Sequence, residues 1–405
     1  MRKVVLVSLD AFFTADVKGL NPEGFLAKVL REGAFCRRVN TIFPALTYPI
    51  HVTMVTGCDP DETGVGQNQP PQPGVPGNER VWYWERKHIR VPTLFDAVKE
   101  AGGRCCSILW PVGCRNPAVR WIFPEVHPLK GENPVVKALR FGTPGYILRE
   151  EKRFGKLRKG IAEPWLSDYA AALAMDTVRR RAPEFTAVHW IDLDNARHHH
   201  GTFSAGAKEA IDRNDRRLGE LWKAMQETPA MKDALLVVVS DHGQEDIRET
   251  VNLTRLMEKY GLDRRFFVQS NGMSACFFPG AEYVPCDPRQ VFTPEQLREM
   301  RVARLYTRED LDALHAVQGP VFAAEAAEGV AFSDALDGEK REAATHGFGP
   351  GREADLCLFA VYGRGVKKCE IPAMEMRDVG PTVAGLMGLE LPRARGTDRS
   401  AELLD

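Results

Sequence analysis

The sequence predicts an α/β fold with a mostly parallel central sheet. Short runs of consecutive apolar residues, which are typical of strands buried on both faces, alternate along the chain with helical patterns. Polar residues that can bind metal ions directly follow three of these apolar runs. This placement fits the fold, because ligands of open α/β sheets bind beyond the carboxyl ends of the strands.

The first half of the chain contains five predicted elements before an irregular stretch. Val4 to Leu9 is an apolar run typical of a buried strand, and Gly33 ends a helix that starts at Pro22. A helix with Thr47 near its N-terminus and Pro49 in its first turn follows. The pattern then predicts a Pro-, Gly- and Gln-rich surface loop at 58–80, a helix at 92–101, a strand at 104–110 and an irregular excursion at 115–165.

In the second half of the chain, strands and helices alternate again, with one long interruption. It predicts helices at 168–181 and 205–226, strands at 187–191, 235–240 and 356–362, and a closing helix at 378–387. About a hundred residues of mixed pattern separate Gly243 from His346. We therefore expect a core formed by residues 1–243 and 346–405, with the excursion at 115–165, and an inserted cap subdomain at 244–345.

The composition excludes several classes of protein. The 405 residues are 44% hydrophobic and 27% charged, with a formal net charge of −1, which is ordinary for a globular protein and gives no reason to expect a nucleic-acid polymer as partner. No apolar run approaches the ~20 residues of a membrane span. The nine cysteines are an odd number without a Cys-x-x-Cys pair, and no secretory apolar region precedes Val4. These features predict a cytoplasmic protein with free thiols and no membrane partner.

Acids and imidazoles follow three of the predicted strands. Asp10 follows the first strand, Asp241 and His242 follow the strand at 235–240, and Asp192 and Asp194 follow the strand at 187–191, with His198 four residues further on. A single Asp after a strand is more often a helix cap. Three such strand ends, two of them with a nearby His, favour metal binding. Asp and His together suit zinc, iron or manganese better than calcium or magnesium.

Thr47 could supply a nucleophile to such a site. A free threonine hydroxyl is a poor nucleophile, and a metal ion is needed to lower its pKa. Two ions about 4 Å apart would clamp a phosphoryl group between the attacking and the leaving oxygen. The helix N-terminus would add backbone N–H groups that bind a phosphoryl oxygen.

Several ordered motifs resemble one family. Ser8-Leu9-Asp10-Ala11, Phe43-Pro44-Ala45-Leu46-Thr47-Tyr48-Pro49-Ile50-His51, Ser240-Asp241-His242-Gly243 and Thr345-His346-Gly347-Phe348 resemble the alkaline phosphatase superfamily. They are most similar to its type I phosphodiesterase/nucleotide pyrophosphatase branch. The resemblance implies an alkaline phosphatase-like three-layer sandwich with an inserted cap subdomain.

The resemblance also implies a role for each matching residue. One metal would be held by Asp10, Thr47, Asp241 and His242, and a second by Asp194, His198 and His346. Zinc is the expected metal, with iron and manganese as alternatives. Asn68 falls where the family has an Asn that binds a non-bridging phosphoryl oxygen.

Residues next to these motifs could support the site or contact the substrate. We expect His51 to brace the Thr47 loop and Arg197 to be solvated rather than to contact substrate. Aromatic residues are candidate contacts for a flat group of the substrate; these are Trp82, Tyr83, Trp84 and Trp110.

The leading function is therefore a metal-dependent hydrolase with a Thr nucleophile and two metal ions, of the phosphodiesterase/nucleotide pyrophosphatase type. Its substrate would be a small phosphate ester, a nucleotide or a phosphonate. A phosphonate hydrolase similar to phosphonoacetate hydrolase and a phosphomonoesterase are the enzymatic alternatives. A non-catalytic binding module on the same fold is a remote one. The sequence does not predict the oligomeric state.

Overall fold

The computed structural model describes residues 1–336 and 342–405. Its centre is a nine-stranded sheet in the order β16-β2-β15-β6-β1-β5-β3-β4, with β17 also paired to β2. Strands β1, β3, β4, β5 and β6 run parallel, whereas β15 is antiparallel to both of its neighbours. The bounds are β1 (Val4–Leu9), β2 (Ala34–Asn40), β3 (Cys105–Ile108), β4 (Trp121–Phe123), β5 (Phe185–Trp190), β6 (Leu235–Val239), β15 (Leu356–Tyr362), β16 (Cys369–Glu370) and β17 (Met374–Glu375).

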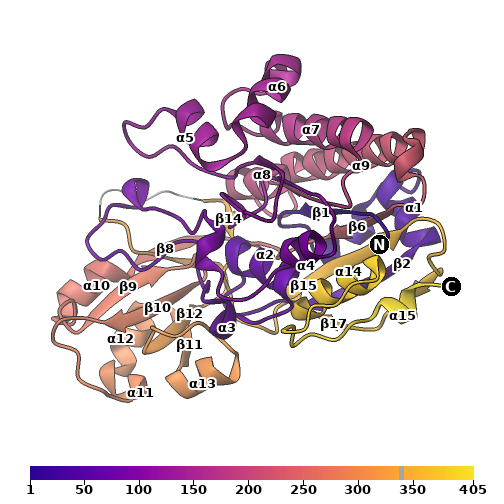
Figure 1. The fold of residues 1–405 in the computed structure, drawn as a ribbon. Helices are drawn as coiled ribbons and strands as arrows, with labels where there is room; N and C mark the ends of the chain where they lie inside the picture. Colours follow the sequence, from indigo (N-terminus) through magenta and orange to yellow (C-terminus); the bar gives the residue numbers. More distant parts are fainter. Residues whose placement is uncertain (337–341) are drawn as a thin grey trace.

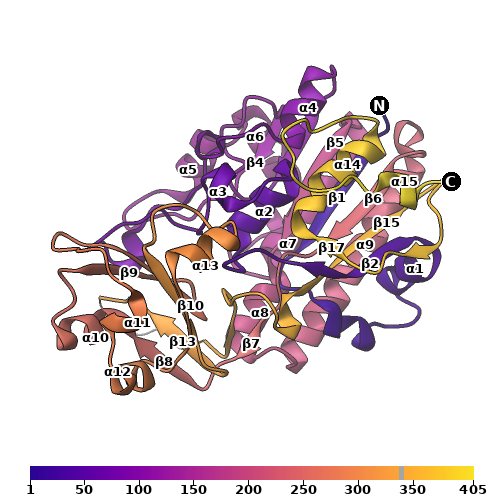
Figure 2. The same ribbon diagram turned by 90° about the horizontal axis from the view of Figure 1, so that it is seen from below.

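Helices cover both faces of this sheet (Figures 1 and 2). Successive residues of β1 alternate between two hydrophobic cores: Val4 and Leu6 pack with the helices of one face, Val5 and Val7 with those of the other. The first face carries α2 (Thr47–Thr56), α4 (Leu94–Glu100) and α14 (Val379–Met387), and the second α1 (Phe25–Glu32), α7 (Trp165–Arg181) and α9 (Ala205–Glu227). The predicted three-layer α/β sandwich is confirmed.

A second lobe extends from the sandwich and contains its own antiparallel sheet, in the order β11-β12-β10-β9 (Figure 1). A separate hydrophobic core lies beneath it. Its strands are β8 (Glu249–Asn252), β9 (Phe266–Ser270), β10 (Ser274–Pro279), β11 (Val302–Tyr306), β12 (Phe322–Ala326) and β13 (Val330–Ser333), and its helices are α10 (Leu253–Tyr260), α11 (Pro288–Val291), α12 (Pro294–Glu299) and α13 (Arg308–Ala313). These elements fall within the predicted cap at 244–345, of which residues 337–341 lie outside the described residues. The boundaries of the two units stay a prediction.

The short strands β7 (Glu245–Asp246) and β14 (Ala344–Thr345) pair where the chain leaves and re-enters the sandwich. They bring the segment before His346 back beside the segment that follows His242. Among the described residues, no helix is long and apolar enough to cross a membrane.

Two stretches differ from the sequence prediction. The excursion at 115–165 contains β4, α5 (Pro134–Phe141) and α6 (Pro144–Phe154), because Asn133 caps the first turn of α5 and proline starts both helices. The predicted surface loop at 58–80 is buried over much of its first ten residues and includes α3 (Pro60–Thr63).

Candidate active site

Three neighbouring strands bring the predicted acids together. β6, β1 and β5 lie side by side and run parallel, so their carboxyl ends share one edge of the sheet. Asp10 follows β1, Asp241 follows β6 by two residues, and Asp194 lies in the first turn of α8 (Asp192–His200), which begins after β5. The parallel order of the strands thus places three carboxylates beside one another.

Thr47 and His346 complete the cluster from other segments. Thr47 is the first residue of α2, and its Oγ1 lies 3.2 Å from His242 Nε2. The His346 ring stacks on the His242 ring, with centroids 3.8 Å apart, and lies 5.5 Å from the His198 ring. All seven residues that the sequence analysis proposes as ligands therefore lie at one site.

The potential ligand atoms form two overlapping groups. Asp10, Asp241 and His242 each present one atom within 4.8 Å of the others, and so do Asp194, His242 and His346. His198 joins the second group through Nε2, which lies 3.3 Å from Asp194 Oδ1. His242 lies between the two groups, whereas the resemblance assigned it to the first alone.

Backbone carbonyls set the orientation of the three imidazoles. Nδ1 of His242 donates to Gly243 O, Nδ1 of His346 to Ala45 O, and Nδ1 of His198 to Ala344 O, at 3.2, 3.0 and 2.9 Å. Each ring then directs Nε2 toward the carboxylates. An imidazole held at one nitrogen by a carbonyl is the usual state of a metal-binding histidine.

The charges of the site fit divalent cations. Asp10 Oδ1 and Asp241 Oδ2 are buried without a hydrogen-bond partner. Burial, followed by the charges of Asp241 and Asp194, raises the pKa of Asp10 well above its usual value. Burial also lowers the pKa of both His242 and His346, which keeps these rings neutral and able to bind a metal. A buried group of carboxylates needs a compensating cation, and this donor set fits zinc, iron or manganese.

Sequence reasoning missed the support of Asp10. His189, on β5, donates from Nε2 to Asp10 Oδ2 at 2.9 Å, and its Nδ1 lies 3.1 Å from Leu109 O and 3.5 Å from Glu125 Oε2. His189 and Glu125 are both buried. The sequence offered no local signal for this contact, because it depends on β5 lying next to β1, which pairs Ser8 with His189.

His51 is also close enough to Asp241 and His189 to form a ligand group with them. Both of its nitrogens are already bonded, Nδ1 to Thr47 O at 2.7 Å and Nε2 to Ser8 Oγ at 2.9 Å. These bonds hold the first turn of α2 against β1, which agrees with the bracing role expected for His51.

Asn68 lies beside the nucleophile segment. Its Oδ1 accepts from Tyr48 N at 2.9 Å, which leaves Nδ2 as the end of the amide that can donate. The same bond uses the backbone N–H of Tyr48. This N–H is therefore not free to bind a phosphoryl oxygen, although such a role was expected for the N–H groups at the start of this helix.

The interpretation of Arg197 is wrong. Arg197 is fully buried, not solvated, and binds Asp16 and the carbonyls of Ala11 and Thr202. Asp192, the other acid that follows β5, accepts from Arg213 at 2.8 Å and from Arg217 at 2.7 Å. Both residues secure α8 rather than contribute to the site.

A cavity of 430 Å³ adjoins the ligands, and His198, His346, Asn68 and Trp82 are among its lining residues. Tyr83, Trp84 and Trp110 do not line it. Trp84 packs in a hydrophobic cluster with Tyr48, and Trp110 packs edge-on against His51. Trp82 is therefore the candidate aromatic contact that borders this cavity.

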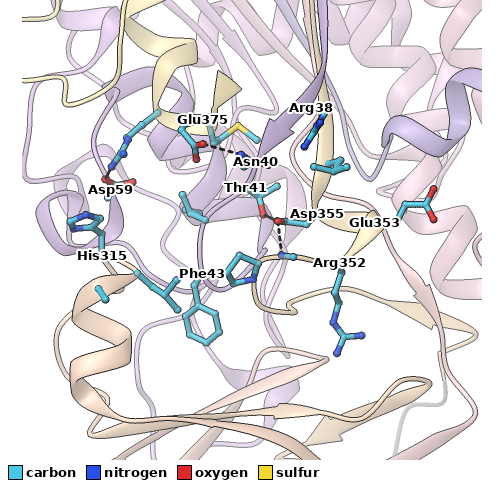
Figure 3. A pocket seen from close by; sticks show the side chains of 18 residues that line it. Arg38, Asn40, Thr41, Phe43, Asp59, His315, Arg352, Glu353, Asp355 and Glu375 are labelled. Atoms are coloured by element: carbon cyan, nitrogen blue, oxygen red, sulfur yellow. Dashed lines mark hydrogen bonds and ion pairs between the residues drawn. The ribbon is translucent and has the colours of Figure 1, made fainter. Parts of the chain in front are cut away.

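A larger cavity of 590 Å³ lies near the ends of β2 and β15 (Figure 3). None of the seven predicted ligands lines it. Many of its polar groups bind one another: Asp355 accepts from Thr41 and from Gly351 N, and Arg377 binds Asp59 at 2.8 Å. The smaller cavity is thus the one that adjoins the candidate active site.

Comparison with known proteins identifies the family of this chain. The family model described as type I phosphodiesterase/nucleotide pyrophosphatase matches residues 4–348. The chain belongs to this family. Its members hydrolyse phosphoric ester or anhydride bonds.

Curated relatives are distant. Human ectonucleotide pyrophosphatase/phosphodiesterase family member 1 is 22% identical over 247 residues, which are 60% of this chain and 23% of that protein. Bovine family member 3 is 20% identical over 253 residues, 60% of this chain and 25% of that protein. The chain thus spans about a quarter of the length of the curated relatives it matches.

Solved structures share the fold over the whole chain. Murine ectonucleotide pyrophosphatase/phosphodiesterase 5 covers 100% of both chains with a TM-score of 0.72 and 18% identity. An inactive form of that murine protein, in complex with AMP, has the same TM-score and 17% identity.

Proposed function

We propose that this chain is a metal-dependent phosphodiesterase or nucleotide pyrophosphatase that uses Thr47 as its nucleophile and two divalent metal ions. The observation that carries the proposal is the cluster of three carboxylates and three imidazoles at one site, with the Thr47 hydroxyl 3.2 Å from His242 Nε2. Asp10, Asp241, His242 and Thr47 would hold one ion, and Asp194, His198 and His346 the other. We propose zinc, with iron and manganese as alternatives.

The bound ions would act as Lewis acids that lower the pKa of the hydroxyl and neutralise charge on the phosphoryl oxygens. The residues of the chain position the reaction. His51 and the start of α2 hold Thr47 in place, with Thr47 Oγ1 3.2 Å from His242 Nε2. Thr47 Oγ1 gives up its proton to solvent and forms a bond to phosphorus, while the bond to the leaving oxygen breaks in line and that oxygen keeps the electron pair. Water then releases the phosphoryl group from Thr47, and Asn68 Nδ2 holds a non-bridging oxygen.

A small phosphate ester or nucleotide is the proposed substrate, which the AMP complex of the murine relative supports. Phosphonoacetate is a weaker candidate, because the described lining of the 430 Å³ cavity includes no lysine to bind its carboxylate. We also propose a cytoplasmic location, supported by nine free cysteines.

Thr47→Ala tests the proposal. We expect it to lower the turnover of bis-p-nitrophenyl phosphate by at least about 10³-fold, because the attacking oxygen is lost, while metal content measured by mass spectrometry is retained. Thr47→Ser, which keeps a hydroxyl, should retain measurable turnover.

Full activity in purified Thr47→Ala protein would refute the nucleophile assignment. Faster hydrolysis of p-nitrophenyl phosphate or phosphonoacetate than of the diester would favour the monoesterase or phosphonate alternative. Metal-free protein with no activity on any of these esters would favour the binding module.

A further inference from the structure

A cavity of 350 Å³ lies between the end of α6 and the C-terminal half of α7, which pack against each other (Figure 1). α7 ends at Arg181, just before β5 begins at Phe185. The cavity therefore lies toward the amino ends of the parallel strands, whereas the proposed metal ligands follow their carboxyl ends. None of the seven proposed ligands lines it.

Arginine side chains outnumber the carboxylates at this cavity. Asp176 is the one acidic residue in its described lining and is 5% exposed. It binds Arg153 of α6, Arg180 Nε at 2.9 Å and Arg181 Nη1 at 3.4 Å. Glu150, which is fully buried, accepts from Arg181 Nη2 at 2.9 Å. Two buried carboxylates therefore face three arginines.

A fourth arginine, Arg179, also lines the cavity. Its Nη2 lies 3.5 Å from Glu227 Oε2, and about half of each side chain is exposed. An exposed ion pair of this kind contributes little, because water competes for both charges. Even with this pair counted, four arginines face three carboxylates among the described residues, and so a positive charge remains.

The three arginines of the lining keep nitrogens that can bind a ligand. A guanidinium group has five N–H donors. The ion pairs described above use Nη1 of Arg153, Nη2 of Arg179 and Nε of Arg180. A helix C-terminus favours basic residues, which explains the arginines at the end of α7. It does not explain why Arg153, from another helix, shares Asp176 with them beside a cavity.

The rest of the lining is apolar and includes Phe154 and Met175. Both are partly buried against the hydrophobic core on this face of the sheet. A volume of 350 Å³ suits a small molecule, and the combination of arginines with apolar side chains suits an oxyanion attached to an apolar group. Three guanidinium groups match the three terminal oxygens of a phosphate monoester better than the two of a carboxylate.

We propose that this cavity binds a phosphate monoester that carries an apolar group, at a site separate from the catalytic one. The phosphate oxygens would accept from Arg153, Arg179 and Arg180, and the apolar group would lie on Phe154 and Met175. A nucleotide and an aliphatic phosphate share this chemistry. The proposal does not depend on the phosphodiesterase function proposed above.

Isothermal titration calorimetry of the metal-loaded protein tests the proposal with benzylphosphonate, whose carbon–phosphorus bond resists hydrolysis. We expect this probe to occupy one more site per chain in wild type than in the double variant Arg153→Met/Arg180→Met. Inorganic phosphate lacks the apolar group and phenylacetate lacks the third oxygen, so both should bind this site at least about tenfold more weakly. AMP and hexylphosphonate distinguish the two sources, because the tighter ligand shows which kind of group the cavity accepts.

Arg179→Met keeps the proposal testable even if the double variant does not fold, because the Arg179 side chain is half exposed. It should weaken binding at the additional site by about tenfold or more, as expected for the loss of a charge-assisted hydrogen bond. Arg364→Met removes a surface arginine paired with Asp233, and this matched control should leave the affinity unchanged. All of these variants should hydrolyse bis-p-nitrophenyl phosphate at the wild-type rate.

An unchanged number of benzylphosphonate sites in the folded double variant, or an unchanged affinity in Arg179→Met, would overturn the proposal. So would equal affinity for benzylphosphonate and inorganic phosphate, or tighter binding of phenylacetate. Failure of the proposed function would look different, because hydrolysis would then be absent in wild type and in every variant while the additional binding site remained.

Discussion

At the scale of single residues, His189 offers a direct test of how Asp10 is positioned. His189 Nε2 donates to Asp10 Oδ2 and leaves Oδ1 without a partner in the direction of His242 Nε2, 3.6 Å away. We expect His189→Phe, which has similar volume but no donor, to weaken metal affinity about 10- to 100-fold, as is usual when a ligand loses its supporting hydrogen bond. Competition with a chromogenic chelator measures this affinity.

His315→Phe is the matched control, because His315 is 42% exposed and lies on the second lobe, with Asp61 as its partner. It should leave metal affinity at the wild-type value. Equal affinity in wild type and folded His189→Phe would show that the bond to Asp10 does not support the ligand.

The position of an individual side chain can be predicted from the sequence only where a local pattern determines it. Asp10, Asp241 and Asp194 follow apolar runs, and so their meeting at one edge follows from parallel strand order alone. Arg197 has no such signal, because its partner Asp16 is 181 positions away and the burial of both depends on how α8 packs. His189 is similar: a histidine within a strand says nothing of Asp10 until the strand order is known.

At the scale of elements, the segment that leads into α7 contains a carboxyl group, Glu163, that is costly to ionise. Burial, followed by the charge of Asp192, raises the pKa of Glu163 from its usual 4.5 to about 7. Its Oε1 has no hydrogen-bond partner, and its Oε2 accepts from Ser167 N at 3.2 Å. The folded protein therefore binds more protons than the unfolded chain between pH 4.5 and about 7. The free energy of unfolding accordingly falls as the pH rises through that window.

Glu163→Gln should remove this dependence. At pH 8 we expect the variant to be more stable than wild type by up to about 3 kcal/mol, and at pH 4 the difference should nearly vanish. Urea denaturation at the two pH values measures this, with the exposed Glu390→Gln as control. A difference that is the same at both pH values would show that Glu163 is not the cause.

Strands with an uninterrupted apolar run and helices with a clear amphipathic pattern were predictable. Elements whose apolar pattern is short or interrupted were missed. β1, β6 and α9 match their predicted ranges within a residue. β2 was missed because Arg37 and Arg38 interrupt its apolar residues. The two helices of the 115–165 excursion were missed although Asn133-Pro134 and Thr143-Pro144 are helix-start signals.

At the scale of the whole molecule, metal ions would join parts of the chain that are far apart in sequence. The seven proposed ligands come from five segments, which end three strands, begin α2 and follow the second lobe at His346. Without cations the folded protein keeps three carboxylates close together at this junction, and repulsion between them opposes folding. Bound ions would remove this repulsion and stabilise the folded chain by their binding free energy, about 4 kcal/mol for each ion at a thousand times its Kd.

Removal of metal should therefore lower the unfolding temperature as well as abolish activity. We expect dialysis against EDTA to lower Tm by several degrees, and zinc to restore Tm and turnover together at two ions per chain. Calorimetry and mass spectrometry measure the two quantities on the same samples. Asp194→Asn should bind one ion fewer and lose less stability on chelation, because it already lacks one of the mutually repelling carboxylates. If fully metal-free protein melts at the same temperature as metal-loaded protein, the carboxylates do not require a cation and the two-metal assignment fails.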